Sequence, residues 1–524
     1  NTPQWFIAMD RVPSNEGNSG QTLREKALNA IDEVGFTPPQ GRNRIRSMVE
    51  GRPDWLVSRQ RAWGVPLTIF VNKETGEILK DEAVDGRIIT AIEAHGADVW
   101  FDTPVEDFLG SDHDPADFEK VTDILDVWFD SGTTHAFVLE GRDDLTWPAD
   151  VYCEGSDQHR GWFQSSLLQS CGTRGKAPFK HIITNGFVVD EQGRKMSKSL
   201  GNVVAPEEII KQYGAEIIRI WVAAGDYTED PRVGKEIIES AVDGYRKLRN
   251  TLRYLLGALD GFDPSEAVEP EMMPELERYM LNRLVEMDAQ VKSAYEAFDF
   301  KRIWRRCIEF SSLDLSAFYL DIRKDALYCD APSSTRRRAA RTVMQACFDR
   351  LTAWLAPICV FTMEEAWASR QGKSVGEVPS VHLRQMPETP AEWSDDGLAT
   401  KWEALRNIRR VVTGALELAR RNKEIGSSNQ ATVSLYLSSD DLNDVVAGHD
   451  LPEFFITGPV IVTVGGIPDG AYSLEDVPGV GVVTGVADTA RCARCWRYTE
   501  DVGTVAGHPD LCVRCAEVLD EMAS

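Results

Sequence analysis

Four cysteines near the end of the sequence have the spacing of a metal site. They form two Cys-x-x-Cys pairs with sixteen residues between them: Cys492, Cys495, Cys512 and Cys515. Two such pairs are typical of a closed tetrahedral thiolate site for zinc, and four thiolates leave no position open for water. The spacing therefore predicts one structural zinc ion rather than a catalytic one. Two disulfides or four free thiols are the alternatives.

A second candidate site is the sequence Lys195-Met-Ser-Lys198-Ser, which is bracketed by Gly193 and Gly201. Two ammonium groups on a glycine-hinged loop can close over a polyphosphate and stabilise negative charge that develops on it in a transition state. Charged loops of this kind also occur without any function. We treat Lys195 and Lys198 as candidate catalytic residues because further motifs accompany them.

One of these motifs is the run Glu-Gly-Ser-Asp-Gln-His-Arg-Gly-Trp-Phe that begins at Glu154. Gly155 would let the backbone approach a ligand closely, and Glu154 could accept a hydrogen bond from an ammonium group. Asp157 or Gln158 could bond sugar hydroxyls or an amine. This run therefore has the donors and acceptors of a small-molecule site.

The other motif is Ser-Arg-Gln-Arg-Ala-Trp-Gly, which begins at Ser58 and contains Trp63. It would add aromatic surface to the site formed by the other two segments. An ordinary strand with tryptophans in the core is the alternative interpretation.

These motifs need elements that place them together. Residues 1–230 mix short β-branched runs with periodic helical stretches, which is typical of an α/β fold. We expect strands at Val151–Glu154 and His181–Val189, each followed by a loop and a helix, with Pro206 in the first turn of the second helix. In open α/β sheets, ligands bind where strands end and helices begin. The two loops are therefore expected to form one site.

From about residue 236 the pattern changes to long amphipathic helices, which predicts a helical bundle. Apolar residues recur at helical spacing in residues 276–298, 303–327, 336–355, 357–368 and 401–424. The last segment also carries arginines that largely avoid its apolar stripe and predict a basic face: Arg406, Arg409, Arg410, Arg420 and Arg421. Strand-like runs return at 431–437, 460–464 and 480–486.

Composition and charge limit the classes of function. The 524 residues, 43% hydrophobic and 27% charged, exclude a disordered chain and provide for several domains. No apolar run reaches the roughly 18 residues of a membrane span, so we expect a soluble protein. The net charge of −26 would repel a nucleic acid at long range, so any such contact must be local. Local excesses of Lys and Arg at 299–350 and 401–430 could provide it, or could be solvated helix faces.

The remaining cysteines favour a reducing cytoplasm. Six lie singly in apolar stretches, where buried free thiols are expected: Cys153, Cys171, Cys307, Cys329, Cys347 and Cys359. The first residues have neither the pattern of a signal peptide nor an initiating Met, so we expect the chain to begin inside a longer one.

The three segments in this order, followed by helices and the Cys-x-x-Cys pairs, resemble the bacterial isoleucyl-tRNA synthetases, which belong to the class I aminoacyl-tRNA synthetases. The Lys-Met-Ser-Lys-Ser loop marks the class. Ser-Arg-Gln-Arg-x-Trp-Gly is shared with the valine enzymes, and the run from Glu154 to Phe163 is particular to the isoleucine enzymes. The resemblance extends over the whole chain.

The resemblance implies an α/β region that is the second half of a class I Rossmann-like nucleotide-binding catalytic domain. An all-α anticodon-binding helical bundle, a small α+β region and a C-terminal zinc-binding module would follow it. The expected segments are a return from the editing insertion at 1–50, the catalytic half at 51–235, the bundle at 236–425, the α+β region at 426–487 and the zinc module at 488–524.

The resemblance also implies the activity, which is ATP-dependent activation of L-isoleucine to isoleucyl-adenylate and its transfer to tRNA(Ile). The enzyme would be a cytoplasmic monomer, with magnesium bound to the ATP. Glu154, Gly155, Asp157 and Gln158 would hold the adenylate, and Trp63 and Trp162 would flank the aliphatic side chain. Lys198, assisted by Lys195, would bind ATP and stabilise its phosphates. The bundle and the zinc module would read the anticodon arm.

One feature of the family is absent from the sequence, because His-x-Gly-His does not occur in it. The chain therefore resembles a C-terminal portion that lacks this signature and most or all of the editing domain. We expect the chain alone to be inactive in adenylate formation. The alternatives are a non-catalytic tRNA-binding module that kept the fold, and valyl or leucyl specificity.

Overall fold

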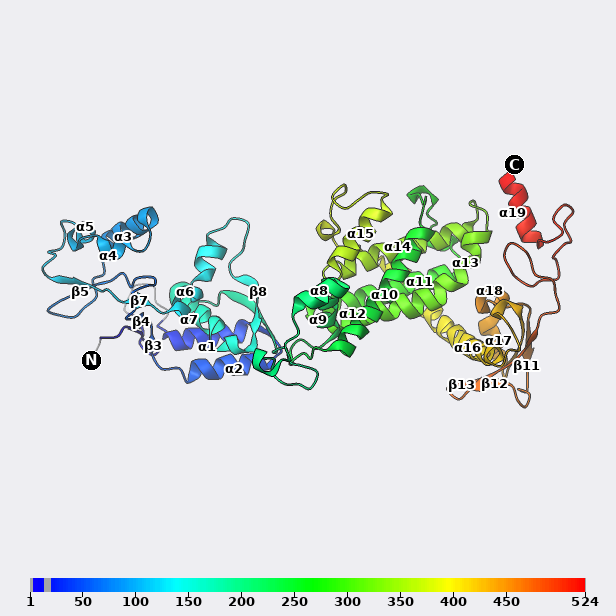
Figure 1. The fold of residues 1–524 in the computed structure, drawn as a ribbon, viewed down its shortest axis with the longest axis horizontal. Coiled ribbons are helices and arrows are strands. Elements are labelled where there is room, and N and C mark those ends of the chain that lie inside the picture. The colour runs from blue at the N-terminus through cyan, green and yellow to red at the C-terminus, as the bar shows by residue number, and fades with distance from the viewer. Residues whose placement is uncertain (1–2, 14–19, 524) are drawn as a thin grey trace. The chain divides into compact units, whose positions relative to one another are not determined.

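The computed structural model describes residues 3–13 and 20–523, and the chain divides into two compact units (Figure 1). The first unit comprises residues 1–195 with 227–231, and the second comprises 196–226 with 232–524. Parts of the predicted return segment, residues 1–2 and 14–19, lie outside the described residues, as does the last residue of the predicted zinc module.

The centre of the first unit is a parallel three-stranded sheet. Its strand order is β2 (Gly35–Thr37), β9 (Phe179–Asn185) and β8 (Ala149–Gly155). The helices around it are α1 (Leu23–Glu33), α2 (Gln40–Glu50) and α7 (Trp162–Arg174). Side chains of the strands and helices share one apolar core, which includes Ile31, Ile45, Phe163, Leu167 and Phe179. Since the strands are parallel, their carboxyl ends lie at one edge of the sheet.

Two expectations for these strands need correction. The strand expected at His181–Val189 ends at Asn185, because the backbone of Gly186 donates instead to Tyr227 O at 3.0 Å. Cys153, expected to be a buried thiol, is exposed, because β8 is an edge strand and only Tyr152 among its residues is buried. The other five single cysteines are buried as expected.

Short antiparallel pairs and small helices make up the rest of the first unit. The strands are β1 (Phe6–Ile7), β3 (Trp55–Leu56), β4 (Ser58–Arg59), β5 (Phe70–Asn72), β6 (Phe118–Lys120) and β7 (Ile124–Leu125), paired as β1–β3, β4–β7 and β5–β6. The helices are α3 (Glu82–His95), α4 (Val99–Asp102), α5 (Val105–Leu109) and α6 (Val127–Gly132). Residues around Phe70, Trp100 and Phe108 form a separate small core under α3–α5.

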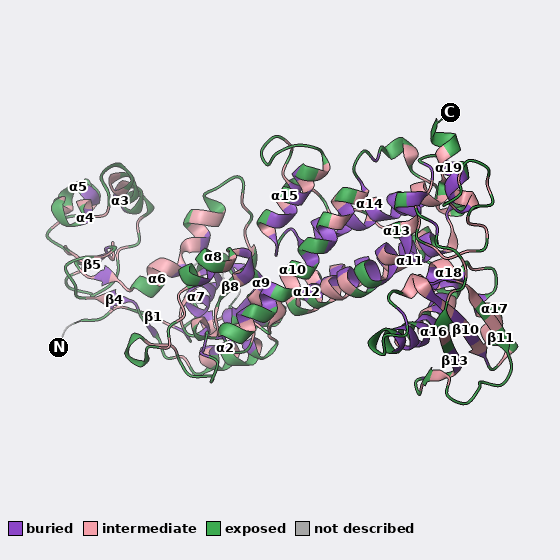
Figure 2. Cartoon of the chain, turned by 45° about the vertical axis from the view of Figure 1, so that its right-hand side comes forward, coloured by how far each residue is buried: buried purple, intermediate pink, exposed green. Residues whose placement is uncertain are grey.

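The second unit is mainly a helical bundle, as the periodicity predicts. Its helices are α8 (Pro206–Tyr213), α9 (Glu216–Ala224), α10 (Lys235–Ala258), α11 (Glu275–Glu296), α12 (Phe300–Glu309), α13 (Leu320–Cys329), α14 (Thr335–Leu355), α15 (Val360–Arg370) and α16 (Asp396–Arg421). A π-helical stretch, Phe310–Tyr319, joins α12 to α13, so the predicted segment 303–327 is helical throughout but not a single α-helix. Figure 2 shows buried residues recurring along α11, α13 and α14. In the described part of the chain, no helix is both long and apolar enough to cross a membrane.

A mixed sheet with two short helices follows the bundle. Its strand order is β11 (Val460–Val464), β10 (Ala431–Leu437), β13 (Val477–Val486) and β12 (Tyr472–Leu474). The short helices are α17 (Asp440–Val446) and α18 (Leu451–Phe455), and α19 (Val513–Ala523) ends the chain. Alternate residues of β10 are buried, which matches the period of two in its sequence. Together with the parallel sheet of the first unit and the helical bundle, this sheet confirms the predicted order of an α/β region, an all-α bundle and a small α+β region.

A buried ion network ties α11, α13 and α18 together. Glu277, whose side chain is 0% exposed, accepts two hydrogen bonds from Arg323 at 2.6 and 2.7 Å. Arg323 also pairs with Glu453 at 2.8 Å, and Glu453 pairs with Arg336 at 2.8 Å. Burial alone would lower the pKa of Arg323, but Glu277 and Glu453 outweigh it and raise that pKa. The network therefore holds the charges of Glu277 and Arg323 in a buried region, where each depends on the other for neutralisation.

We expect Glu277→Gln to destabilise the second unit by about 3 kcal/mol or more, because it leaves a buried guanidinium without its main counter-charge. The free energy of unfolding is measured in urea, with hydrogen exchange of the amides in α11 and α13 as the probe. Asp476→Asn removes the partner of Arg410 in an exposed pair of the same unit and should leave the unfolding midpoint unchanged. Equal midpoints for Glu277→Gln and the wild type would contradict this account of the network.

Candidate active site and metal centre

The predicted adenylate-binding loop leaves the carboxyl end of β8 beside the carboxyl end of β9. Glu154 and Gly155 pair in register with Thr184 and Asn185. A 3-10 turn, Ser156–His159, then leads into α7. The sheet therefore brings the start of this loop next to the point where the segment with the lysine motif leaves β9.

Within the loop, the side-chain amide of Gln158 forms two hydrogen bonds. Gln158 donates to Asp157 Oδ2 at 3.2 Å through Nε2 and accepts from the backbone N–H of Trp162 at 3.1 Å through Oε1. A Cβ added at Gly155 would lie 2.7 Å from Asp157 Oδ1, so glycine is needed here to leave room for the carboxylate. Glu154 and Asp157 are exposed, which leaves both carboxylates accessible to a ligand.

Trp162 stands at the start of α7 on an aromatic platform. Its ring stacks on Tyr152 with centroids 4.3 Å apart and an interplanar angle of 6°. Burial raises the pKa of Tyr152 to about 12, so the phenol stays protonated. The indole Nε1 donates to Ser131 O at 3.0 Å. These contacts fix the orientation of Trp162.

Helix α6 is part of this site, and sequence reasoning missed it. It supplies Ser131 O to Trp162, and the Trp128 ring lies so close to Gly161 that a Cβ there would be 2.8 Å from it. The run Trp128-Phe-Asp-Ser-Gly132 directly after β7 was the available signal, since small and polar residues follow two aromatic ones. α6 and α7 together form one wall of the site.

The segment with Trp63 is tied to the same wall. Strand β4 pairs with β7, which directly precedes α6, and Arg59 forms an ion pair with Asp126 at 3.2 Å. Trp63 itself is 89% exposed. An indole in solvent to this extent is not packed against Trp162, so the structure brings the segment to the site but does not bring the two tryptophans together.

Lys195 follows a tight hairpin. Val189 and Lys195 form an antiparallel bridge, and the Asp190 carboxylate accepts from the backbone N–H groups of Gln192 at 3.1 Å and Arg194 at 2.8 Å. Asp190 also binds the Arg194 side chain at 2.7 Å. The described side chain of Lys195 is exposed at the end of this hairpin.

Lys198 belongs to the second compact unit, which begins at Met196. It opens a single 3-10 turn, Lys198–Leu200, whose N-cap is Ser197. Asn202 Oδ1 accepts from the Ser197 backbone N–H at 2.9 Å, and Gly201 closes the turn with φ of +64°. Lys198 is exposed. These short-range hydrogen bonds contribute to the conformation of the loop around Lys198.

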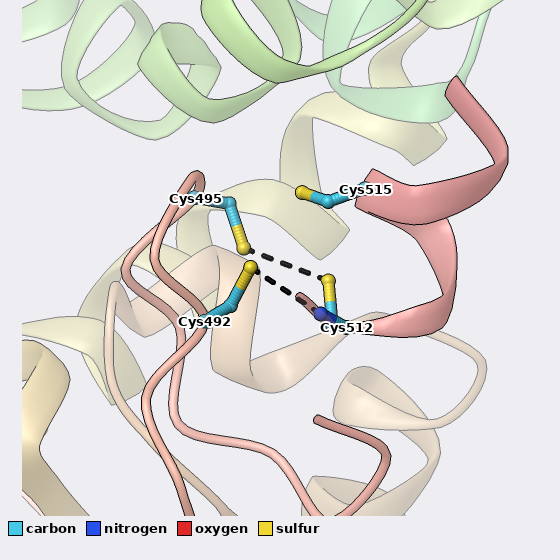
Figure 3. A group of neighbouring side chains, drawn as sticks. All are labelled: Cys492, Cys495, Cys512 and Cys515. Atoms are coloured by element: carbon cyan, nitrogen blue, oxygen red, sulfur yellow. Dashed lines mark hydrogen bonds between the residues drawn. The ribbon is translucent and has the colours of Figure 1, made fainter. Parts of the chain in front are cut away.

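The four paired cysteines converge on one point (Figure 3). Their Sγ atoms all lie within 4.8 Å of one another, and those of Cys495 and Cys512 are 3.8 Å apart. A tetrahedral zinc ion with Zn–S bonds of about 2.3 Å has sulfur atoms about 3.8 Å apart. The donor set and its spacing fit a four-cysteine zinc finger with one ion.

Backbone donors favour the thiolate form of Cys492, whereas without a metal ion the pKa values of the other three cysteines are raised: Cys495, Cys512 and Cys515. Burial would raise the pKa of Cys492, but backbone N–H groups of Cys495, Cys512 and Arg494 outweigh it and lower that pKa to about 6. The N–H of Cys512 lies 3.4 Å from Cys492 Sγ, and Arg494 Nη1 lies 3.6 Å from Cys515 Sγ. A metal-bound thiolate can accept hydrogen bonds from such N–H groups.

Arginines near the metal centre and on α16 are largely paired within the protein. Arg514 binds Asp325, with one contact at 2.8 Å, and Arg497 binds Asp450 at 2.9 Å. Of the predicted basic face on α16, Arg409 is buried and donates to Phe454 O at 3.0 Å, and Arg406 pairs with Asp314. The basic face predicted for α16 is therefore smaller than expected, because α18 and the π-helical stretch cover part of it. Arg410, Arg420 and Arg421 are exposed as predicted.

Family models match three parts of the chain. Residues 1–234 match tRNA synthetases class I (I, L, M and V), residues 277–435 match the anticodon-binding domain of tRNA ligase, and residues 491–518 match the zinc finger found in FPG and IleRS. The class that the fold and these matches define is that of the class I aminoacyl-tRNA synthetases.

Whole-chain comparisons narrow the class to one family. The chain is 54% identical to the isoleucine–tRNA ligase of Mesorhizobium japonicum, over 100% of this chain and 52% of that protein. It is 55% identical to the isoleucine–tRNA ligase of Brucella abortus, over 100% of this chain and 53% of that protein. It is 52% identical to the isoleucine–tRNA ligase of Caulobacter vibrioides, over 99% of this chain and 53% of that protein. The chain belongs to the isoleucine–tRNA ligase family and spans about half the length of these curated relatives. The resemblance found in the sequence is thereby confirmed.

Among solved structures, the chain is similar to the LeuRS of Agrobacterium radiobacter, whose crystal structure is a ternary complex with tRNA and LeuAMS. Sequence identity is 17% and the TM-score is 0.48, over 87% of this chain and 56% of that one.

The metal centre gives a direct prediction. We expect one zinc ion per chain by elemental analysis, and Cys492→Ser should lose it while circular dichroism of the remaining helices is largely retained, because thiolate coordination stabilises mainly its own small module. Cys347→Ser, which changes a buried thiol in α14, is the matched control and should keep its zinc. Four free thiols and no zinc in the purified wild type would contradict the assignment.

Proposed function

We propose that this chain is the part of an isoleucine–tRNA ligase that carries the adenylate loop, the mobile lysine loop, the anticodon-binding bundle and a structural zinc module. The reaction is activation of L-isoleucine with ATP to isoleucyl-adenylate, followed by transfer to the terminal ribose of tRNA(Ile). The observation that carries the proposal is the paired carboxyl ends of β8 and β9, from which both candidate catalytic segments leave.

In this proposal the loop after β8 binds the adenylate. The exposed carboxylate of Glu154 accepts from the ammonium group of isoleucine, and Asp157 and Gln158 bind the ribose hydroxyls or the amine. Gly155 keeps the backbone close to the ligand. Trp162, held by Tyr152 and Ser131 O, offers an apolar face to the aliphatic side chain, and Trp63 closes over that side chain only after its exposed loop moves.

The lysine loop acts on the phosphates. In the first step a carboxylate oxygen of isoleucine bonds to the α-phosphorus of ATP, and the bond to pyrophosphate breaks. The Lys198 ammonium group, assisted by Lys195, neutralises the charge that develops on the departing pyrophosphate. Magnesium is bound to ATP as part of the substrate. The glycine on each side of the motif lets the loop close at this moment and open afterwards.

The second unit binds the tRNA. The family match at 277–435 supports contact of the bundle with the anticodon arm, and the zinc module extends this surface. Since the chain is acidic overall and many arginines are paired internally, attraction to the phosphates is confined to a few exposed cations. Binding is therefore weak, and it decreases with salt in proportion to the number of these contacts.

The absence of His-x-Gly-His from the sequence favours a second candidate, a tRNA-binding module without catalytic activity. In class I enzymes that signature grips ATP opposite the lysine loop. Loss of one partner of a jointly positioned site can remove an orientation advantage of roughly 7–11 kcal/mol. The two candidates differ in whether activity returns when the signature is supplied.

We expect the 524-residue chain alone to show no detectable isoleucine-dependent pyrophosphate exchange, and to gain it when the N-terminal half of the Brucella abortus relative is fused to it. The chain alone should still bind tRNA(Ile) weakly at low salt. Robust exchange by the isolated chain would contradict the division of the site, and a fusion that stays inactive would favour the non-catalytic module.

In such a fused chain, Lys198→Ala should slow isoleucine-dependent pyrophosphate exchange by on the order of 10²-fold or more and change isoleucine binding less, because the ammonium group acts on charge that appears in the transition state. Lys180→Ala is the matched control, since Lys180 is an exposed lysine on β9 that pairs with Asp150 at 2.7 Å. An unchanged exchange rate for Lys198→Ala would remove this residue from the mechanism.

A further inference from the structure

The stretch between β9 and the lysine hairpin is bound by a segment from later in the chain. Residues 186–189 follow β9, and three of their four backbone N–H groups donate to residues 227–231, which we call the returning segment. The three hydrogen bonds are Gly186 N–H to Tyr227 O at 3.0 Å, Phe187 N–H to Asp230 Oδ1 at 2.8 Å and Val189 N–H to Pro231 O at 3.0 Å. The returning segment therefore takes the place of a neighbouring strand after β9 has left its sheet.

The two stretches approach so closely at Gly186 that no side chain fits between them. A Cβ built at Gly186 would lie 2.2 Å from Glu229 O and 2.7 Å from the backbone nitrogen of Asp230. The φ angle of Gly186 lies outside the left-handed region, so glycine is needed here for the close approach and not for the backbone conformation. An alanine at this position would have to push the returning segment away.

Val189 connects the returning segment to the hairpin that carries the lysine motif. Its N–H is bound by Pro231 O, and the same residue forms the antiparallel bridge with Lys195. The Val189 side chain is buried. Directly after it, the Asp190 N–H donates to Arg194 O at 3.0 Å and closes the hairpin. The position of the returning segment therefore determines where the hairpin places Lys195.

The returning segment is short, and the chain on both sides of it belongs to the second unit. Helix α9 ends at Ala224 and α10 begins at Lys235. The carbonyl oxygen of Arg232, the first residue after the segment, accepts from Trp221 Nε1 at 2.9 Å, and Val233 is buried in the core of the bundle. A short segment with fixed ends has few conformations to lose, so it can support the stretch that it binds at a small entropic cost.

We propose that Gly186 and Asp230 are positioning residues for the lysine loop. By binding residues 186–189, the returning segment fixes the base of the hairpin and thereby the place from which Lys198 reaches the phosphates of ATP. This inference rests on the proposed function, and it adds two residues that act through the loop and not on the substrates. Asp230 is exposed, so its contribution is the hydrogen bond to the Phe187 N–H and not the packing of a core.

A purely structural role would have different consequences. The adenylate loop leaves β8, whereas the printed hydrogen bonds of the returning segment go to the stretch after β9. A shift of that stretch should misplace the lysines and leave the isoleucine site intact, so kcat falls while the KM for isoleucine is retained. General loosening of the first unit would change both constants.

The test uses the chain fused to the N-terminal half of the Brucella abortus relative and measures isoleucine-dependent pyrophosphate exchange. Gly186→Ala and Asp230→Ala should each lower kcat by about fivefold or more and change the KM for isoleucine by less than about twofold. Asp230→Asn keeps an acceptor oxygen and should retain the wild-type kcat. Gly86→Ala is the matched control, because a Cβ at this exposed position of α3 meets nothing within 4 Å.

A combination with the lysine variants shows whether the effect passes through the loop. In a chain that carries Lys195→Ala and Lys198→Ala, Gly186→Ala should lower kcat by less than about twofold further, because residues that act as a unit are not additive. A full fivefold loss in this background, or equal effects of Gly186→Ala on kcat and KM in the parent fusion, would overturn the positioning role.

Hydrogen exchange of the backbone amides in the 524-residue chain gives a readout besides activity. Gly186→Ala and Asp230→Ala should speed amide exchange in residues 186–195, whereas Asp230→Asn and Gly86→Ala should leave it unchanged. Wild-type amide exchange in both Gly186→Ala and Asp230→Ala would overturn this inference alone, as would wild-type kcat of both variants in an active fusion. A wild-type fusion without pyrophosphate exchange would instead overturn the proposed function, and this inference with it.

Discussion

The parallel pairing of β8 with β9 is the constraint on which the candidate active site depends. Parallel strands end at the same edge of a sheet, so Gly155 and Asn185, thirty residues apart, become neighbours. The loop that starts at Glu154 and the segment that leads to Lys195 then leave from one place. The rest of the first unit supports this arrangement: α7 carries Trp162, α6 braces it through Ser131 O, and β4 and β7 fasten the third segment to α6.

Many arginines of the second unit form ion pairs with acidic residues inside the protein. Examples are the buried network around Glu277 and the Arg514–Asp325 contact that joins the zinc module to α13. An arginine paired in this way positions an element but adds little to the attraction for phosphates. The module at the end of the chain therefore derives its position from ion pairs, while its internal fold derives from the four sulfurs.

Features that depend on local pattern could be predicted from the sequence. The strands at 431–437 and 460–464 have the predicted bounds, Pro206 begins its helix, and the convergence of the four cysteines follows from their spacing. Features that depend on tertiary contacts could not. The burial of Arg409 requires α18 beside it, and the exposure of Cys153 follows from its edge strand. Helix α6 joins the site through its contact with Trp162, which the sequence alone does not show.

The lysine loop combines a rigid part and a weak part, and this division suits its proposed role. The hairpin before Lys195 is held by Asp190 through several hydrogen bonds and an ion pair, whereas the turn at Lys198 relies on Ser197 and Asn202. A hydrogen bond of this kind contributes about 1 kcal/mol net, so closure of the second part would have to break only interactions of this size at the turn itself. A lysine that must follow charge as it moves onto a leaving group needs such freedom, and the firm hairpin confines the rearrangement to the residues after Lys195.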